Sequence, residues 1–138
     1  MHKNNCKDSS SESSIQELAN RAQNHDRQGN FQGAEKLYKK VIVKSKSEYG
    51  ENDVFTLRIM QNLAIVQRNQ GKYLEAADLN RKCLDKMKLV LGENHRDTLD
   101  SMQGLAVTLS RQNKFSEAET LNKECLDRSI AVLGYLIL

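Results

Sequence analysis

The chain has 138 residues, of which 38% are hydrophobic and 28% are charged, a balance typical of one globular domain. The formal net charge is only +3 and aromatic residues make up 5%, so composition argues against a nucleic-acid partner. No apolar run approaches the ~20 residues of a membrane-spanning helix and no signal peptide is evident, so we expect a cytoplasmic protein without a membrane partner.

The first 14 residues are polar and rich in serine. Such a segment cannot bury enough apolar surface to order itself, so we predict a disordered tail over residues 1–14. The sequence Ser14-Ile15-Gln16-Glu17 has the form of a capping box, in which Ser14 and Glu17 cap each other's backbone amides. It predicts that the first helix begins at Ser14.

An internal repeat of 42 residues organises the rest of the chain. It is marked by three equivalent segments, Gly29-Asn30-Phe31, Gly71-Lys72-Tyr73 and Asn113-Lys114-Phe115. We expect three repeats, over residues 15–56, 57–98 and 99–134, followed by an apolar tail over residues 135–138. A repeat of this size cannot bury its own apolar face and must stack on its neighbours.

Each repeat is predicted to contain two helices. In the second repeat Leu57, Met60 and Leu63 share one helical face, which Asn69-Gln70-Gly71-Lys72 interrupts. A second helix then follows over about 74–91 and ends at Gly92; its equivalents are about 32–49, before Gly50, and 116–133, before Gly134. The absence of proline and of alternating strands excludes a β-propeller repeat.

Small residues separate the two helical repeat families that remain, HEAT-like pairs and tetratricopeptide repeats. The tetratricopeptide pattern requires small residues where helices cross closely. It maps here onto Met60, Leu63, Ala64, Gln67, Ala76 and Asn80. The chain therefore resembles an all-α protein, an α-solenoid of about three tetratricopeptide helix-turn-helix repeats, with six helices in a right-handed superhelix.

Within that family, the chain resembles the 42-residue repeats of kinesin light chains, and similar arrays occur in nephrocystin-like proteins and in the C-terminal regions of large nucleotide-binding signalling ATPases. The resemblance is carried by Asn62-Leu63-Ala64, Asn69-Gln70-Gly71-Lys72-Tyr73-Leu74-Glu75-Ala76 and Val90-Leu91-Gly92-Glu93-Asn94-His95-Arg96-Asp97-Thr98-Leu99. Those relatives usually have His-Pro-Asp-Thr between repeats, and this chain lacks the proline at Val54 and at Arg96. We expect Asp53 and His95 to cap the following helices instead. The resemblance implies a non-enzymatic scaffold or adaptor that binds proteins.

The first helices of the repeats should line a concave groove. The residues predicted to form a peptide-binding groove are Asn20, Gln23, Arg27, Arg58, Gln61, Asn62, Ile65, Arg68, Asn69, Gln103, Val107 and Arg111. Ala19 and Gly104 fall on the same predicted faces. The arginines predict an extended peptide that is acidic, or mixed acidic and apolar, with Ile65 and Val107 receiving an apolar anchor.

Asn20 and Asn62 occupy one repeat position, and asparagines at this position hold the bound peptide in related arrays. Gly104 replaces the third, which leaves this clamp incomplete or makes room for a large peptide side chain. The alternative for both asparagines is a solvated helix face.

No catalytic site, metal site or cofactor is predicted. His2, His25 and His95 lie in separate parts of the chain, with no ligand or triad spacing around them. The odd number of cysteines and the lack of a CxxC pair predict free thiols.

The end of the chain departs from the repeat pattern. Where the earlier repeats continue with Glu-Asn, this one continues with an apolar segment, so the last helix pair should expose a sticky surface. The residues of this possible end-to-end interface are Leu133, Tyr135, Leu136, Ile137 and Leu138. Two explanations stay open: a truncated piece of a longer array, or a surface used for homodimerisation or docking.

Overall fold

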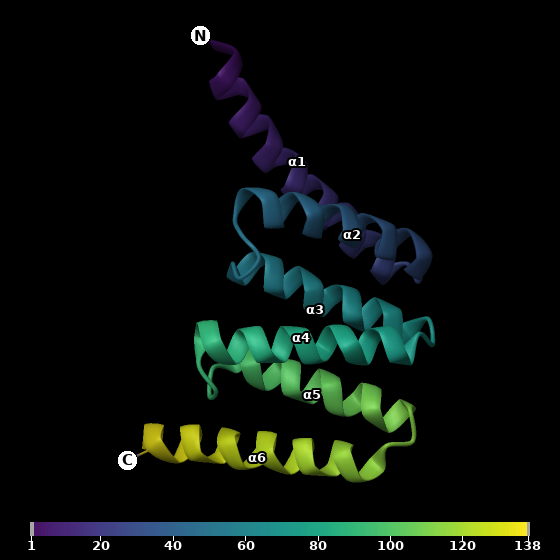
Figure 1. Ribbon diagram of the computed structural model, residues 1–138, viewed down its shortest axis with the longest axis vertical. Helices are drawn as coiled ribbons and strands as arrows, with labels where there is room; N and C mark the ends of the chain where they lie inside the picture. Colours follow the sequence, from purple (N-terminus) through teal and green to yellow (C-terminus); the bar gives the residue numbers. More distant parts are fainter. Residues whose placement is uncertain (1, 138) are drawn as a thin grey trace.

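The fold is a single stack of antiparallel α-helices, shown by a computed structural model that describes residues 2–137 (Figure 1). For residues 2–13 and 135–137 only the backbone is described. Across residues 2–137 there is no strand, and the helices are α1 (His2–Arg27), α2 (Phe31–Glu48), α3 (Val54–Asn69), α4 (Tyr73–Leu91), α5 (Arg96–Arg111) and α6 (Phe115–Ile137). Each helix packs on the next, which confirms the predicted all-α array of helix pairs.

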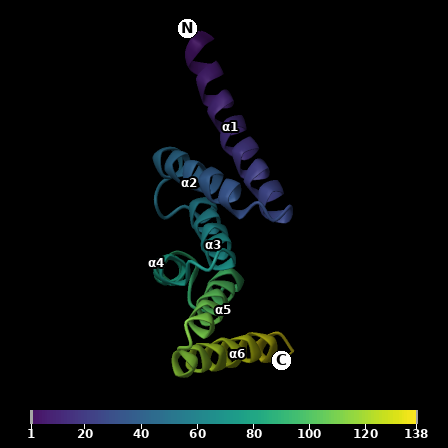
Figure 2. The same ribbon diagram turned by 90° about the vertical axis from the view of Figure 1, so that its right-hand side faces the viewer.

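The stack has two different sides. Figure 2 shows α1, α3 and α5 along one side and α2 and α4 along the other. In addition to the contacts between consecutive helices, α3 contacts α5 directly. α3 and α5 therefore adjoin on the side that they share with α1, and α2 and α4 lie on the opposite side.

The turn inside each repeat has the same backbone conformation at the marker position. Gly29, Gly71 and Asn113 have φ angles of +80°, +82° and +65°, in the left-handed region. Glycine adopts this conformation without steric cost, and asparagine is among the few other residues that tolerate it. The Lys72 amide donates to the Gln67 carbonyl at 2.9 Å and closes a Schellman motif that ends α3.

The connections between repeats are closed by side-chain caps. Asp53 Oδ1 accepts from the Phe55 amide at 2.9 Å, and His95 Nδ1 accepts from the Asp97 amide at 3.0 Å. The buried Thr98 hydroxyl also donates to the Gly92 carbonyl at 2.8 Å. The predicted caps are confirmed, and they begin α3 and α5 without the proline of the related repeats.

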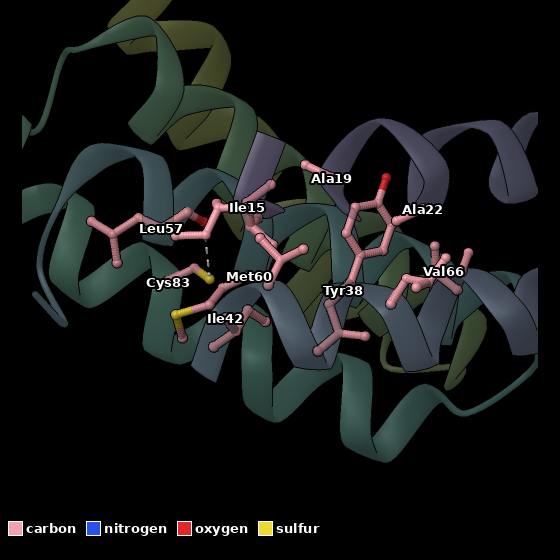
Figure 3. Packing of buried hydrophobic residues seen from close by; sticks show 14 of the residues in the cluster. Ile15, Ala19, Ala22, Tyr38, Ile42, Leu57, Met60, Val66 and Cys83 are labelled. Atoms are coloured by element: carbon pink, nitrogen blue, oxygen red, sulfur yellow. Dashed lines mark hydrogen bonds between the residues drawn. The ribbon is translucent and has the colours of Figure 1, made fainter. Parts of the chain in front are cut away.

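The larger of two hydrophobic clusters joins the first two repeats (Figure 3). The Tyr38 ring from α2 is 2% exposed and points toward Ala22 of α1. Leu57 of α3 and Cys83 of α4 are fully buried, and the Cys83 thiol donates to the Leu57 carbonyl at 3.9 Å. Burial raises the pKa of the Cys83 thiol to about 12, so Cys83 behaves as a core residue.

A smaller cluster joins the second and third repeats. Its buried residues include Leu84 of α4, and Met102, Leu105 and Leu109 of α5. Side chains of this size contribute about 1.5–3 kcal/mol each when fully buried. Neighbouring repeats are thus held together by the apolar faces that the 42-residue pattern predicted.

The N-terminal helix begins earlier than predicted. α1 starts at His2, and residues 2–14 are helical where the sequence predicted a disordered tail and a helix start at Ser14. No glycine or proline interrupts this segment, so nothing in it forces a helix boundary. Ser14 is therefore not an N-cap, and its hydroxyl accepts from Lys44 Nζ at 3.0 Å. The first turns of α1 project beyond α2 in Figures 1 and 2.

The last helix continues past its predicted end. Gly50 and Gly92 have φ angles of +106° and +95° at the ends of the first two repeats, but Gly134 has no positive φ and lies inside α6. The residues that follow Gly134 are Tyr, Leu and Ile, which extend the helix, where the earlier repeats have Glu-Asn. The prediction that Gly134 ends this helix is wrong.

Candidate functional site

The predicted groove residues lie on α1, α3 and α5, outside the hydrophobic core. Seven of them are exposed: Asn20, Gln23, Arg27, Arg58, Asn69, Gln103 and Arg111. Five are half-buried: Gln61, Asn62, Ile65, Arg68 and Val107. Ala19 is an exception to the predicted face, because it is 8% exposed and belongs to the larger core cluster.

Arg58 is already paired within the protein. Its Nε and Nη2 atoms donate to Asp97 Oδ2 at 3.1 and 2.8 Å, from α3 to the first turn of α5. The Arg58 side chain is 60% exposed, and such surface pairs contribute about 0–1 kcal/mol. Asp97 was not recognised from sequence as a partner, and its pairing with Arg58 is a contact between α3 and α5.

Arg68 and Arg111 are a neighbouring pair among the arginines predicted to line the groove. Arg68 Nη1 donates to the Gly104 carbonyl at 3.4 Å, which holds the half-buried side chain of Arg68 against α5. Burial, and secondarily the charge of Arg111, lower the pKa of the Arg68 guanidinium from its usual value. Neither arginine has an ion pair with any described carboxylate. An anion near both guanidinium groups would relieve their repulsion.

The asparagine positions differ from one repeat to the next. Asn20 Oδ1 accepts from Gln16 Nε2 at 3.1 Å along α1. Asn62 is half-buried, and its amide makes no hydrogen bond to any described residue. Asn62 therefore keeps both a donor and an acceptor available for a peptide backbone.

At the third position, the Gly104 carbonyl accepts several hydrogen bonds. Its donors are Arg68 Nη1, Asn80 Nδ2 at 3.4 Å and Thr108 Oγ1 at 3.0 Å. A Cβ atom built at Gly104 would meet only Asn80 Oδ1, at 3.7 Å, which is an ordinary contact. Gly104 thus has no side chain that could bind a peptide, although the space around it would admit a Cβ atom.

The predicted end-to-end interface lies only partly within the described residues. Leu133 is 59% exposed, as are its neighbours Leu126 and Ile130, at 59% and 57%. The side chains of residues 135–138 are outside the described part of the chain. Homodimerisation through this end stays a prediction.

The described residues contain neither a metal-binding cluster nor a membrane-spanning helix. Among them, no group of at least three His, Cys, Asp or Glu side chains could hold a metal ion. None of the helices described for this chain is both long and apolar enough to cross a membrane.

Comparison with known proteins agrees with the geometry. The sequence profile of the tetratricopeptide repeat family matches residues 14–88 and 68–131. No curated protein matches the chain.

Solved structures resemble the chain at low sequence identity. A putative kinesin light chain of Podosopora anserina with nearly identical TPR-like repeats gives a TM-score of 0.77 at 19% identity, over 87% of this chain and 57% of that one. A point variant of that protein gives 0.79 at 19% identity, over 88% and 57%. BtubC (BKLC) from P. vanneervenii gives 0.54 at 16% identity, over 88% and 65%.

The chain thus spans somewhat more than half the length of these structures. At such identities the likeness establishes the fold, and the profile match over residues 14–131 establishes the family. The chain belongs to the tetratricopeptide repeat family, with the fold of the kinesin light chain TPR-like repeats.

Proposed function

We propose that this chain is a non-enzymatic adaptor that binds an extended acidic, or mixed acidic and apolar, peptide segment on the surface formed by α1, α3 and α5. Tetratricopeptide folds act as protein interaction scaffolds, and the proposal concerns which surface is used and for what ligand. The observation that carries it is the pair Arg68 and Arg111, two neighbouring cations without a carboxylate partner among the described residues.

The chemistry around this pair fits a peptide. A carboxylate would find guanidinium donors at Arg68 and Arg111, and hydrogen bonds of this charged type contribute about 1.5–3 kcal/mol. The free amide of Asn62 would bind a peptide group, and half-buried Ile65 and Val107 offer apolar contact on the same helices. Arg58 contributes little to this proposal because Asp97 already neutralises it.

The pairing of Arg58 provides a matched control. A fluorescein-labelled peptide of about ten residues containing aspartate, glutamate and leucine is titrated with the intact chain, and binding is followed by anisotropy. We expect the double variant Arg68→Ala/Arg111→Ala to weaken binding at least about tenfold. Arg58→Ala should change it by less than about threefold.

The control also defines the results that would contradict the proposal. Unchanged binding in the double variant would exclude these arginines as the site. An equal loss in Arg58→Ala would show that only overall charge matters. Far-ultraviolet circular dichroism of every variant checks that the helices remain folded.

A second candidate function is docking or self-assembly through the C-terminal end. It is favoured by the exposure of Leu126, Ile130 and Leu133 on one side of α6. Sedimentation at several protein concentrations tests self-assembly. A strict monomer at every concentration would exclude self-assembly through this end.

A further inference from the structure

The outer surface of the stack contains two equivalent clefts between second helices. One has a volume of about 640 Å³ and lies between α2 and α4, and the other has about 540 Å³ and lies between α4 and α6. Their lining residues correspond at the 42-residue spacing: Lys39 with Arg81, Ile42 with Leu84, Val43 with Asp85, Lys46 with Lys88, Leu63 with Leu105, and Leu79 with Leu121. The clefts are the same site in successive repeats, so each is an internal reference for the other.

The two clefts differ in charge. Four lysines and one glutamate line the α2–α4 cleft, a formal net charge of +3. Two cations and two carboxylates line the α4–α6 cleft, a formal net charge of zero. In that second cleft Arg81 and Glu117 form an ion pair at 3.2 Å, which uses one cation internally.

The lysines of the α2–α4 cleft stand on both of its walls. Lys39 and Lys46 lie two helical turns apart on α2, and Lys82 and Lys86 lie one turn apart on α4. Only Lys39 has a carboxylate partner within the described chain, at 3.6 Å. Lys46, Lys82 and Lys86 have no ion pair or hydrogen bond to any described residue. Two rows of cations thus face a shared cleft with little internal neutralisation.

Apolar side chains also line the cleft. Ile42, Met60 and Leu63 are buried at its base, whereas exposed Val43 and half-buried Leu79 share the helical faces of the lysines on α2 and α4. Val43 is 70% exposed, although it is a β-branched apolar residue on the outer surface. In the other cleft the equivalent residue is Asp85, so an exposed apolar side chain at this position is specific to the α2–α4 cleft.

We propose that the α2–α4 cleft is a second binding site, which takes an acidic amphipathic helix from a partner protein. Apolar side chains at i, i+4 and i+7 of that helix would cover Val43 and Leu79, as in other helix-in-groove interfaces. Carboxylates on its flanks would lie against the two rows of lysines. The site is on the opposite side of the stack from the groove of Arg68 and Arg111, and the inference does not depend on that groove.

The experiment uses the full chain and a defined probe. The probe is a fluorescein-labelled helical peptide of about 16 residues, with leucines at the stated spacing and glutamates beside them; a scrambled peptide of the same composition is the reference. We expect the amphipathic peptide to bind at least about tenfold more tightly than the scrambled one, because only it presents an apolar stripe.

Variants then separate the charge contribution from the apolar one. Lys46→Glu/Lys82→Glu and Val43→Asp should each weaken binding at least about tenfold, since the latter gives the first cleft the aspartate of the second. Lys88→Glu, the equivalent of Lys46→Glu in the α4–α6 cleft, and Arg68→Ala/Arg111→Ala should leave binding within about twofold.

Several outcomes would overturn the inference. An equal loss in Lys88→Glu would show that net charge alone attracts the peptide, and unchanged binding in Val43→Asp would exclude an apolar contact at Val43. Polyphosphate binding that needs the lysines but is indifferent to Val43→Asp, with no preference for the amphipathic peptide, would identify a polyanion site instead. Loss in Arg68→Ala/Arg111→Ala alone would place the peptide in the other groove. Val43, Lys46 and Lys82 are exposed, and circular dichroism checks that every variant remains folded.

Discussion

The two junctions between repeats carry different side chains at equivalent positions. Between the first and second repeats, Glu35 is only 8% exposed and accepts from Gln70 Nε2 at 2.9 Å and Lys72 Nζ at 3.0 Å. Between the second and third repeats, Ala77 occupies the position of Glu35, and Gln112 occupies that of Gln70. The Gln112 Oε1 atom is buried there without a hydrogen-bond partner in the described chain.

The comparison shows that the same helix packing accommodates either a charged residue, Glu35, or an apolar one, Ala77, at this position. Burial on its own raises the pKa of the Glu35 carboxyl, but hydrogen bonds from Lys72 and Gln70 and the charge of Lys39 outweigh it, so the pKa lies below its usual value. The hydrogen bond with Glu35 in turn raises the pKa of the Lys72 ammonium. Ala77 needs no such partners, because it buries only a methyl group.

The largest expected effect compares the apolar contacts at the two junctions. Leu57 is fully buried, whereas its equivalent Leu99 is half-buried. We expect Leu57→Ala to lower the free energy of unfolding by about 2–5 kcal/mol because it leaves a cavity. Leu99→Ala should lower the free energy of unfolding by clearly less. Urea denaturation measures both, and equal losses would mean that the junctions are packed equally well.

The charged junction is tested next by removing its carboxylate. We expect Glu35→Gln to lower the free energy of unfolding by about 1–3 kcal/mol at pH 7, because Lys72 and Gln70 lose a charged acceptor. The folded pKa of Glu35 lies below its ordinary value of 4.5, so the stabilisation is complete above that pH and is lost as the pH falls through the folded pKa. Thermal melts from pH 7 to about pH 3 should show the difference between wild type and variant shrinking below about pH 4.5.

The converse substitution asks whether the second junction can become charged. Ala77→Glu places a carboxylate at the position of Glu35, with Gln112 and Lys114 at the positions of Gln70 and Lys72. We expect this variant to be less destabilised than Ala77→Glu/Lys114→Met, in which the carboxylate has lost its cation. Equal stability of the two would show that Lys114 does not reach the junction.

The smallest expected effect concerns the glycine in α5. Gly104 lacks a positive φ, and an added Cβ would make only an ordinary contact of 3.7 Å with Asn80 Oδ1. Gly104→Ala should therefore stabilise the chain by about 0.5–1 kcal/mol, measured by urea denaturation. Gly71→Ala is the control and should destabilise, because the φ of +82° at Gly71 suits glycine. A loss of stability in Gly104→Ala would mean that α4 and α5 need a closer approach.

Most of the fold could be predicted from the repeat itself. Turn residues at Gly29, Gly71 and Asn113 and caps at Asp53 and His95 act locally, so sequence spacing was sufficient to find them. Gly134 has the same residue type as Gly50 and Gly92, but the apolar residues after it continue the helix. Whether a glycine ends a helix here thus depends on whether the residues after it also favour a helical conformation.

The candidate site was less predictable, because side chains from different repeats decide which charges stay free. The helical face of Arg58 and Arg68 could be assigned from spacing, but the ion pair of Arg58 with Asp97 depends on how α3 and α5 stack. The charge difference between the outer clefts likewise arises from residues in different helices, such as Val43 and Lys82. Periodicity predicts which side of a helix is exposed, and the packing of neighbours determines the chemistry there.

The exposed side of α6 bears on how the molecule opens. Leu84 of α4 is 5% exposed, whereas its equivalent Leu126 in α6 is 59% exposed, because α4 packs between α3 and α5, whereas α6 packs mainly against α5. In a repeat array, stability is roughly the sum of each unit's own term and its interfaces with neighbours. Backbone amides of α6 should therefore exchange with solvent through local fraying of the last helix, while those of α3 and α4 exchange only when the whole array unfolds.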